Sequence, residues 1–331
     1  MKTLMNLRGR SLLKLDDLTE EEVIGLLDLA QELKTKRKQG LRGDLLAGKH
    51  IALVFEKMST RTRCAAMVAV ADEGGTAEYL SADDIHLGHK ESVADTARVL
   101  GRMFHGLLFR GFKQSTVELL ARRSGIPVWN GLTDDAHPTQ ALADLMTVRE
   151  RFGRLKGLRV VYVGDGRNNV CNSLMVGCSK TGMHFVNCAP PELSPREDLV
   201  ERARRTAERN GGSVTVAIDP QSGVRGGNVV YTDVWASMGE ESKFQERVRL
   251  LRPYQVNMDM MRRTGNVDNG TAIFLHCLPA FHDHNTTLTK DIGPLEVTDE
   301  VFEAGFSLVF DQAENRLHTM KALFVATLAN A

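Results

Sequence analysis

The run Ser59-Thr60-Arg61-Thr62-Arg63 places hydroxyl and guanidinium groups side by side in the sequence. It follows the apolar run Ile51 to Phe55 and opens a helix-like stretch from Thr62 to Glu73. Backbone N–H groups and the helix dipole favour an anion at a helix start, and both side-chain types donate well to phosphate oxygens. We therefore predict a phosphate site here. The alternative is a helix cap with solvated arginines, and the G-x-x-x-x-G-K pattern of a P-loop is missing.

The segment His137-Pro138-Thr139-Gln140 has the composition of a helix start, with proline near the first helical position, where its missing N–H is harmless. A histidine and an amide at such a place can donate to a carbonyl oxygen and accept from an –NH2 group. The segment therefore suits a ligand that carries both groups. An ordinary helix cap is the alternative.

Two reactive side chains lie at the ends of apolar runs that are typical of buried strands. Asp233 comes after Val229–Thr232, with Ser237 nearby, and Cys277 comes after Ile273–Leu275. Open α/β sheets bind ligands at the carboxyl ends of their strands, and a carboxylate with a nearby hydroxyl suits an ammonium group. The alternatives are a strand-end turn for the aspartate and a buried, apolar role for the cysteine.

The loop Gly164-Asp165-Gly166-Arg167-Asn168-Asn169 lies between an expected strand and an expected helix, as a dinucleotide-binding loop does. Asn169 stands where the G-x-G-x-x-G pattern has its third glycine. That difference argues against an NAD-linked oxidoreductase.

Extended and helical patterns alternate along nearly the whole chain, which is typical of parallel βαβ units. Apolar runs predict strands at 51–55, 106–109, 126–129, 159–163, 184–188, 213–218, 229–232 and 273–275. Helical spacing predicts helices at 62–73, 92–103, 116–123, 139–150, 172–181, 196–208, 241–251 and 313–328, after a first one that Thr19 and Glu22 open with a capping box. The predicted fold class is α/β, with two doubly wound lobes whose parallel β-sheets are flanked by helices.

A chain of 331 residues is long enough for about two domains. The best boundary is the stretch 152–157, which gives a first domain of residues 1–150 and a second of residues 151–312. We expect the C-terminal helix, in residues 313–331, to return to the first lobe.

The composition indicates neither a nucleic-acid nor a membrane partner, because Lys+Arg and Asp+Glu are both 42 and the formal net charge is zero. No apolar run approaches the ~20 residues of a membrane helix, and residues 1–10 lack the apolar core of a signal peptide. The five cysteines show no C-x-x-C spacing, which argues against a disulfide framework or a structural zinc site. We therefore expect a soluble, cytoplasmic protein.

Four blocks of the sequence resemble, in the same order, those of the aspartate/ornithine carbamoyltransferase family. They are Phe55 to Arg63, which is similar to the family's carbamoyl-phosphate signature, His137 to Gln140, Asp233 to Gly239, and His276 to Pro279. Any one block would be a weak signal, whereas all of them in order are specific. The resemblance runs from about Leu12 to Leu328 without a large gap.

The resemblance implies a set of ligands for carbamoyl phosphate: Ser59, Thr60, Arg61, Thr62, His86, Arg110, His137, Gln140, Cys277, Leu278 and Arg316. Arg61, Arg110 and His137 would stabilise the oxyanion of a tetrahedral intermediate. The backbone carbonyls of Cys277 and Leu278 would accept from the carbamoyl –NH2. His86 would reach into the site of a neighbouring subunit, and the alternative is a solvated loop histidine.

Other residues match the ornithine branch of the family. Ser237-Met238-Gly239 does so, and Cys277 stands where the aspartate branch typically has proline. The resemblance implies that Asn169 holds the α-carboxylate of ornithine, with Asn168 as the register alternative. Asp233 and Ser237 would face the α-ammonium, and the Met238 N–H would meet a carboxylate. Cys277, paired with Asp233, would lie beside the δ-amine, so the implied catalytic residues are Cys277, Asp233, Arg110 and His137.

The reaction implied by the resemblance moves the carbamoyl group of carbamoyl phosphate to the δ-amine of L-ornithine, giving L-citrulline and phosphate. It belongs to arginine metabolism, and arginine biosynthesis is one direction it can serve. No metal and no organic cofactor are expected, because carbamoyl phosphate is already activated. The family implies a homotrimer, or a multiple of trimers, with sites at subunit interfaces. The alternatives are a carbamoyltransferase for a related amine such as putrescine, and an inactive family member that only binds carbamoyl phosphate.

Overall fold

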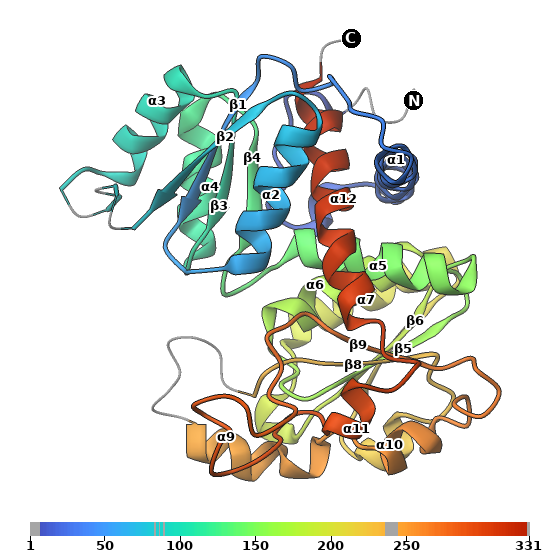
Figure 1. The fold of residues 1–331 in the computed structure, drawn as a ribbon. Helices are drawn as coiled ribbons and strands as arrows, with labels where there is room; N and C mark the ends of the chain where they lie inside the picture. Colours follow the sequence, from blue (N-terminus) through green and yellow to red (C-terminus); the bar gives the residue numbers. More distant parts are fainter. Residues whose placement is uncertain (1–6, 83, 86, 89, 236–243, 330–331) are drawn as a thin grey trace. The chain divides into compact units, whose positions relative to one another are not determined.

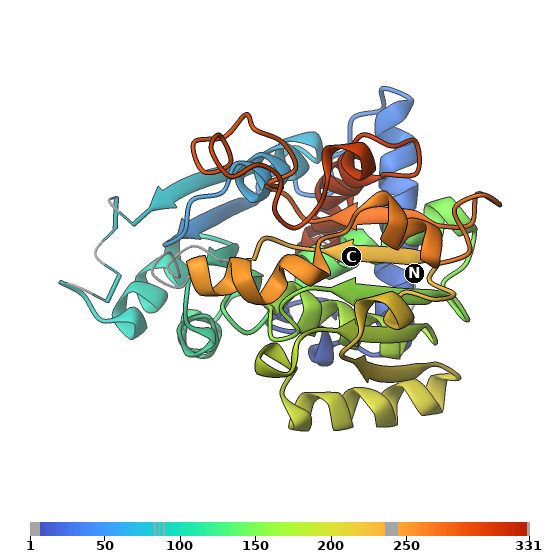
Figure 2. The same cartoon turned by 90° about the horizontal axis from the view of Figure 1, so that it is seen from below.

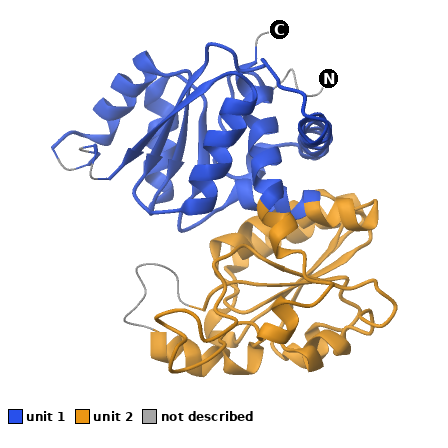
Figure 3. Cartoon of the chain, viewed as in Figure 1, with its two compact units in different colours: residues 1–146, 314–331 blue, residues 147–313 orange. Residues whose placement is uncertain are grey.

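The computed structural model describes residues 7–329 apart from 83, 86, 89 and 236–243. The chain divides into two compact units (Figure 3). Unit 1 holds the described residues up to Met146 and those from Glu314 onward, and unit 2 spans Thr147 to Ala313. Each unit is built on its own parallel sheet.

Unit 1 has a four-stranded parallel sheet with the order β2-β1-β3-β4. Its strands are β1 (His50–Phe55), β2 (Thr76–Ser81), β3 (Gly106–Arg110) and β4 (Val128–Leu132). The chain runs outward from β1 to β2 and then crosses to the other side of β1 for β3 and β4. The strand order therefore reverses between β1 and β3, whose register pairs Phe55 with Arg110.

Helices cover both faces of this sheet (Figure 1). They are α3 (Val93–Met103) and α4 (Gln114–Ser124) on one face, and α2 (Thr60–Asp72) and most of α12 (Val309–Leu328) on the other. Unit 1 also contains a 3-10 turn at Leu15–Asp17, α1 (Glu20–Lys38) and the beginning of α5 (Pro138–Phe152). One face packs on α3 and α4 in a buried cluster that includes Val54, Phe109 and Leu120. Side chains alternate between the two faces along a strand, so each buried strand contributes to both layers.

Unit 2 has a five-stranded parallel sheet with the order β7-β6-β5-β8-β9. Its strands are β5 (Arg159–Val163), β6 (His184–Cys188), β7 (Ser213–Ala217), β8 (Val229–Thr232) and β9 (Ile273–His276), and Figure 2 shows them running side by side in one direction. The strand order reverses between β5 and β8. The register of the next pair places Thr232 of β8 beside His276 of β9.

Helices also cover both faces of the second sheet, with α6 and α7 on one side and α9, α10 and α11 on the other (Figure 1). The bounds are α6 (Asn169–Lys180), α7 (Glu197–Asn210), α8 (Pro220–Gly223), α9 (Phe244–Leu251), α10 (Met258–Arg263) and α11 (Asp299–Phe302), with 3-10 turns at Pro191–Leu193 and Arg252–Tyr254. The buried cluster on the second side includes Val161, Val230, Phe274 and Met261.

The predicted fold class is confirmed: two parallel α/β lobes flanked by helices. The predicted capping box is present at α1, where the Glu22 N–H donates to Thr19 Oγ1 at 3.2 Å and the Thr19 N–H donates to Glu22 Oε2 at 2.8 Å. Three predicted strands, 159–163, 184–188 and 229–232, have the observed bounds of β5, β6 and β8. Fully buried strands give continuous apolar runs, which is why the sequence predicts the bounds of these three strands.

The patterns predict no strand at 76–81, where the structure has β2. This strand lies at the edge of its sheet, is only partly buried, and carries Glu78 at its centre. An edge strand needs no apolar run, so its sequence lacks the signal on which the prediction relies. The helix expected at 241–251 is described only from Phe244 onward.

The C-terminal helix α12 packs into unit 1, as predicted. Phe324 lies against the Trp129 ring of β4, with 4.6 Å between ring centroids. Lys321 is 2% exposed, and its Nζ pairs with Asp72 Oδ2 at the end of α2, at 2.7 Å. None of the described helices, α12 included, is long and apolar enough to cross a membrane.

Candidate active site

The predicted anion-binding residues of unit 1 lie at the carboxyl ends of its strands, around the point where the strand order reverses. Ser59 to Thr62 follow β1, Arg110 is the last residue of β3, and His137 follows β4. Open α/β sheets bind ligands at such a switch point. This edge of the first sheet is therefore the candidate anion site of unit 1.

Ser59 is the N-cap of α2, and its Oγ accepts from the Thr62 N–H at 3.2 Å. The capping interpretation of the motif is thus correct for this hydroxyl, and it does not exclude an anion, because a helix start has four backbone N–H groups without intrahelical partners. Thr60 is exposed. Arg63, which is in the motif but not among the predicted ligands, places its guanidinium 3.7 Å from the centroid of the Tyr79 ring on β2.

Two buried guanidinium groups meet at the hydroxyl of Thr62. Arg316 Nη2 donates to Thr62 Oγ1 at 3.0 Å, and Arg110 Nη1 donates to the same oxygen at 3.4 Å. Arg316 Nη1 also donates to Gln140 Oε1 at 2.6 Å, and Gln140 Nε2 donates to Asp144 Oδ1 at 2.9 Å. Two positive charges this close in a buried place favour an anion, and guanidinium geometry suits phosphate.

His137 lies in the positive field of these groups. Burial and the charges of Arg316, Arg110 and Arg61 lower the pKa of its imidazole well below the ordinary value. Its backbone carbonyl accepts from the Gln140 N–H at 3.1 Å and so opens α5. A neutral imidazole has one N–H donor and one acceptor nitrogen, and it can therefore donate to a carbonyl oxygen without carrying a charge.

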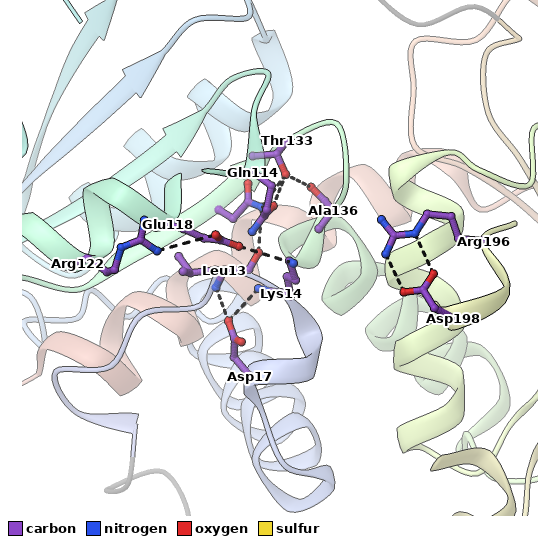
Figure 4. A network of polar contacts seen from close by, with 11 residues as sticks. Leu13, Lys14, Asp17, Gln114, Glu118, Arg122, Thr133, Ala136, Arg196 and Asp198 are labelled. Atoms are coloured by element: carbon purple, nitrogen blue, oxygen red, sulfur yellow. Dashed lines mark hydrogen bonds and ion pairs between the residues drawn. The ribbon is translucent and has the colours of Figure 1, made fainter. Parts of the chain in front are cut away.

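The loop that leads into His137 is held by a buried polar network (Figure 4). Thr133 Oγ1 donates to Gln114 Oε1 at 2.6 Å, and the Thr133 N–H donates to the Ala136 carbonyl at 2.9 Å. Asn130 Nδ2, from β4, donates to Thr133 Oγ1 at 3.1 Å. These bonds fix the turn before α5, so the backbone that carries the His137 imidazole is held in place.

Lys57 follows β1, inside the sequence block from Phe55 to Arg63, and is not among the predicted ligands. Its side chain is 7% exposed, its Nζ pairs with Asp134 Oδ1 at 2.7 Å, and it lies 4.3 Å from the centroid of the Phe112 ring. The pair ties the segment after β1 to the segment before α5. Its position inside the Phe55–Arg63 motif was the available signal, but the partner could not be read from sequence.

In unit 2, Asp233 and Cys277 lie side by side. The register of β8 and β9 pairs Thr232 with His276, so the next residues of the two strands adjoin. Cys277 Sγ donates to Asp233 Oδ1 at 3.0 Å, and the same oxygen accepts from the Val234 N–H at 2.8 Å. A thiol and a buried carboxylate are therefore in hydrogen-bond contact at the carboxyl edge of the second sheet.

The two asparagines of the loop after β5 have different surroundings. Asn168 is the N-cap of α6: its Oδ1 accepts from the Val170 N–H at 2.7 Å, and its Nδ2 donates to Asp233 Oδ2 at 2.9 Å. Asn169 is the first residue of α6 and is half-buried. The two oxygens of the Asp233 carboxylate are thus held by different groups, Cys277 on one and Asn168 on the other.

The segment after β9 forms a tight turn around His276. The Leu278 N–H donates to His276 Nδ1 at 2.9 Å, which makes Nδ1 an acceptor, and Nε2 faces Glu296 Oε1 at 3.2 Å. Both His276 and Glu296 are fully buried. Leu278 has a left-handed backbone, with φ at 58°, and precedes a cis peptide bond to Pro279.

An ion pair that the sequence did not reveal joins the glycine-containing loop to α9. Arg247 Nη1 lies 2.9 Å from Asp165 Oδ2, and the two side chains are 6% and 12% exposed. Asp165 lies in the loop from Gly164 to Asn169, whose sequence resembles a dinucleotide-binding loop. Arg247 lies in a helix with no motif, so nothing in the sequence pointed to it.

Three predicted site residues, His86, Ser237 and Met238, lie outside the described residues. The other predicted residues fall into two groups. Unit 1 contains Ser59, Thr60, Arg61, Thr62, Arg110, His137, Gln140 and Arg316, and unit 2 contains Asn169, Asp233, Cys277 and Leu278. Each group gathers at the carboxyl edge of its own sheet.

Two groups of side chains in the described part of the chain could hold a metal ion. They are Asp233, His276 and Cys277, and His282, Asp283 and Asp299. In the second group His282 Nδ1 already lies 2.7 Å from Asp299 Oδ1, and Asp299 is well exposed. The residue types alone assign no metal to either group. In the first group Cys277 Sγ donates to Asp233 and His276 Nδ1 accepts from the Leu278 N–H, and exposed acidic groups such as the second are common without an ion.

Family models match nearly the whole chain. Residues 10–150 match the carbamoyl-P binding domain of aspartate/ornithine carbamoyltransferase. Residues 156–327 match the Asp/Orn binding domain of aspartate/ornithine carbamoyltransferase. Together the two ranges contain all four sequence blocks described above.

Full-length relatives agree with these models. A catabolic ornithine carbamoyltransferase of Bacillus licheniformis is 57% identical over 336 residues, which cover 100% of this chain and 99% of that protein. One from Bacillus cereus is 54% identical, with the same coverage of 100% and 99%. The solved structure of ornithine carbamoyltransferase from Pyrococcus furiosus matches with a TM-score of 0.90 at 43% identity, covering 97% of this chain and 98% of that chain.

Proposed function

This chain belongs to the aspartate/ornithine carbamoyltransferase family, and we propose that it transfers the carbamoyl group of carbamoyl phosphate to the δ-amine of L-ornithine. The products are L-citrulline and phosphate. The observation that carries the choice of ornithine is the hydrogen bond between Cys277 and Asp233. The family's aspartate branch typically has proline in place of this cysteine, and a proline could not make that bond.

The proposed ligands of carbamoyl phosphate are Ser59, Thr60, Arg61, Thr62, His86, Arg110, His137, Gln140, Cys277, Leu278 and Arg316. Phosphate oxygens would bind to the guanidinium groups and to the first turn of α2. His137 would donate to the carbonyl oxygen, a role supported by the lowered pKa that keeps its imidazole neutral. Gln140 also supports Arg316, because its Oε1 accepts from that guanidinium at 2.6 Å.

The proposed ligands of ornithine are Asn169, Asp233, Ser237 and Met238. We assign the α-carboxylate to Asn169 rather than to Asn168, because the Asn168 amide is already used by Asp233 and by the Val170 N–H. Asp233 would face an ammonium group. Cys277, held by Asp233, would lie beside the attacking δ-nitrogen.

The proposed reaction begins with the neutral amine, since an alkylammonium has a pKa of about 10 and cannot attack. Its nitrogen forms a bond to the carbamoyl carbon, and the carbonyl oxygen becomes an oxyanion that Arg61, Arg110 and His137 stabilise. The carbon–oxygen bond to phosphate then breaks, and phosphate leaves with the bonding electron pair. The proton lost by nitrogen passes to the departing phosphate, with Cys277 and Asp233 orienting the amine. The chemistry requires no metal or organic cofactor, because the substrate is an activated anhydride.

We propose that the physiological direction is catabolic. Support comes from the Bacillus relatives at 57% and 54% identity, both of which are named catabolic. In that direction phosphate attacks citrulline, and carbamoyl phosphate and ornithine are released. The biosynthetic direction, which the sequence resemblance also implied, has no support from these relatives.

We further propose the domain roles and the assembly. Residues 1–150 with the C-terminal helix, 313–331, would bind carbamoyl phosphate, and residues 151–312 would bind ornithine. The matched ranges 10–150 and 156–327 support a boundary near residue 150, and the place of the helix is supported by its packing in unit 1. On the basis of the family resemblance, we propose a homotrimer or a multiple of trimers, with His86 acting in the site of a neighbouring subunit. The cysteine pattern supports a cytoplasmic location. Mixing inactive His86→Ala chains with inactive Arg316→Ala chains tests the shared site. We expect the mixture to recover activity. No recovery after proven subunit exchange would contradict the shared site.

A citrulline assay in both directions tests the proposed reaction. Purified full-length chain is given carbamoyl phosphate with ornithine, putrescine or an acylated ornithine. We expect citrulline from ornithine, together with phosphate-dependent cleavage of citrulline. Product with putrescine alone would overturn the choice of amine. Binding of carbamoyl phosphate without turnover of any amine would instead identify an inactive family member.

A further inference from the structure

Gln312, in the first turn of α12, is a fully buried amide that belongs to none of the sequence blocks above. The His276 N–H donates to Gln312 Oε1 at 3.0 Å, and Gln312 Nε2 donates to the Tyr231 hydroxyl at 3.1 Å. The orientation of the amide follows from chemistry, because a backbone N–H can only donate and so must meet the amide oxygen.

The position of this amide is explained by the place of β9 at the edge of the sheet. An edge strand has outward N–H and C=O groups with no neighbouring strand. At Phe274 a passing segment supplies the partners: the Phe274 N–H donates to the Phe306 carbonyl at 3.0 Å, and the Leu308 N–H donates to the Phe274 carbonyl at 3.1 Å. The N–H of His276, two residues further on, points the same way, and Gln312 supplies its acceptor.

We propose that Gln312 is a positioning residue for Cys277, an inference that rests on the proposed function. Its amide fixes the last N–H of β9, and the next residue along the chain is Cys277. On the other side of the cysteine, the Leu278 N–H is fixed by His276 Nδ1 at 2.9 Å. Cys277 is thus bracketed by two anchored residues, and its Sγ reaches Asp233 Oδ1 at 3.0 Å.

The same amide contacts the second strand of the pair. Tyr231, which accepts from Gln312 Nε2, lies on β8 two residues before Asp233. One side chain therefore touches residues that precede both members of the thiol–carboxylate pair. Loss of the acceptor would leave a buried N–H unsatisfied and would let the end of β9 shift, and a shift of about 1 Å at reacting groups can cost about a hundredfold in rate.

Three variants separate the contact of Gln312 with the His276 N–H from its contact with the Tyr231 hydroxyl. Gln312→Leu removes both, and we expect kcat for citrulline formation to fall about tenfold to a hundredfold, with the KM for carbamoyl phosphate changed less than about twofold. Gln312→Glu keeps an acceptor for the His276 N–H and should retain more of kcat than Gln312→Leu. Tyr231→Phe removes the second bond and keeps the acceptor for the His276 N–H, so it should stay closer to wild type than Gln312→Leu.

Asn228→Ala is the matched control. The Asn228 side chain also bridges backbone groups of neighbouring strands, since its Oδ1 accepts from the Arg159 N–H at 2.9 Å and its Nδ2 donates to the Thr271 carbonyl at 3.2 Å. It lies at the amino ends of the strands, away from Cys277. We expect this variant to lower the unfolding temperature and to leave kcat as in wild type.

Alkylation of Cys277 by iodoacetamide gives a readout that does not depend on turnover. Cys277 is half-buried, and Cys64 is exposed and serves as the internal reference. Mass spectrometry of the labelled peptides should show that Gln312→Leu changes the rate at Cys277 and leaves the rate at Cys64 unchanged. Asn228→Ala should change neither rate.

Equal kcat values for Gln312→Leu and Asn228→Ala in folded protein, or an unchanged labelling rate at Cys277, would overturn the positioning role. If wild-type protein makes no citrulline, the proposed function fails instead. The labelling experiment still decides the positioning of Cys277 in that case, so the two failures are distinguishable.

Discussion

Cys277 Sγ donates to Asp233 Oδ1 at 3.0 Å, at the point where two neighbouring parallel strands end. The other oxygen of that carboxylate accepts from Asn168 Nδ2 at 2.9 Å. The carboxylate is therefore oriented from two sides, by groups that follow β5 and β9. Such pre-orientation is what an active site needs before a substrate arrives, because the reacting groups then require little rearrangement.

Removal of the thiol should lower turnover. We expect Cys277→Ala to reduce kcat for citrulline formation about a hundredfold or more, because it removes the group proposed to orient the amine and leaves Asp233 without one donor. Cys277→Ser keeps a donor and should retain more activity. Initial rates at saturating carbamoyl phosphate and ornithine provide the measurement. Because the thiol and the carboxylate are in hydrogen-bond contact, the losses from Cys277→Ala and Asp233→Asn should not be additive, and additive losses would show that the pair is not one unit.

Thr62 should matter for the affinity of the anion. Its hydroxyl accepts from both Arg110 and Arg316, so Thr62→Val removes the group that aligns them. Hydrogen bonds to charged groups contribute about 1.5–3 kcal/mol, so we expect carbamoyl phosphate to bind about tenfold to a hundredfold more weakly. Calorimetry with carbamoyl phosphate or inorganic phosphate measures this. Thr19→Ala, which removes a helix cap in α1, is the control, and an equal loss in both variants would contradict the role of Thr62.

The sequence was sufficient to predict the parallel α/β class and most of the strands, since buried parallel strands are continuous apolar runs. It was insufficient for β2, whose edge position requires no such run. It also placed Asp233 and Cys277 at the ends of strands, but their contact depends on the register of β8 and β9, which no local pattern encodes.

Other parts of the candidate site depend on distant segments and could not be predicted. The motif contains two arginines with the same local signal, yet Arg63 stacks on Tyr79 and only Arg61 contributes to the field at His137. Gln312 has no motif, and its role appears only when α12 is seen beside the end of β9. Local sequence patterns indicate which segments are buried and where helices are capped. Contacts between residues that are far apart in the sequence follow only from the assembled fold.

Asn168 and Asn169 should have separable roles. Asn168→Asp places a second carboxylate next to Asp233 Oδ2, where the wild-type amide donates at 2.9 Å. Neighbouring like charges disfavour ionisation, so the acidic limb of the kcat profile should move to higher pH. Asn169→Ala should instead raise the KM for ornithine and leave the profile in place. Full pH profiles for both variants measure this, and a shifted profile for Asn169→Ala with none for Asn168→Asp would reverse the assignment.

Phe324 should stabilise unit 1, because its ring packs 4.6 Å from Trp129 in the buried layer beside β4. We expect Phe324→Ala to lower the free energy of unfolding by about 3–5 kcal/mol, the usual cost of deleting a buried aromatic side chain. Urea denaturation followed by Trp fluorescence measures it. Phe310→Ala is the control, since Phe310 lies in the same helix and is 65% exposed. Similar losses for the two variants would show that α12 does not depend on this contact.

Folding stability should fall as the pH is lowered through about 6.5, the ordinary pKa of histidine, because folded His137 resists protonation. Burial, and then the charges of Arg316, Arg110 and Arg61, hold its pKa well below that value. The unfolded chain therefore binds a proton that the folded chain does not, and the free energy of unfolding decreases as the pH falls below the unfolded pKa. His137→Asn should flatten this dependence. Urea titrations of both proteins above and below that pH provide the measurement.

The pKa of His318 is also lowered, and His318 is present in both proteins, so only the difference in stability between the two proteins reports His137. Equal losses of stability on acidification would contradict the prediction.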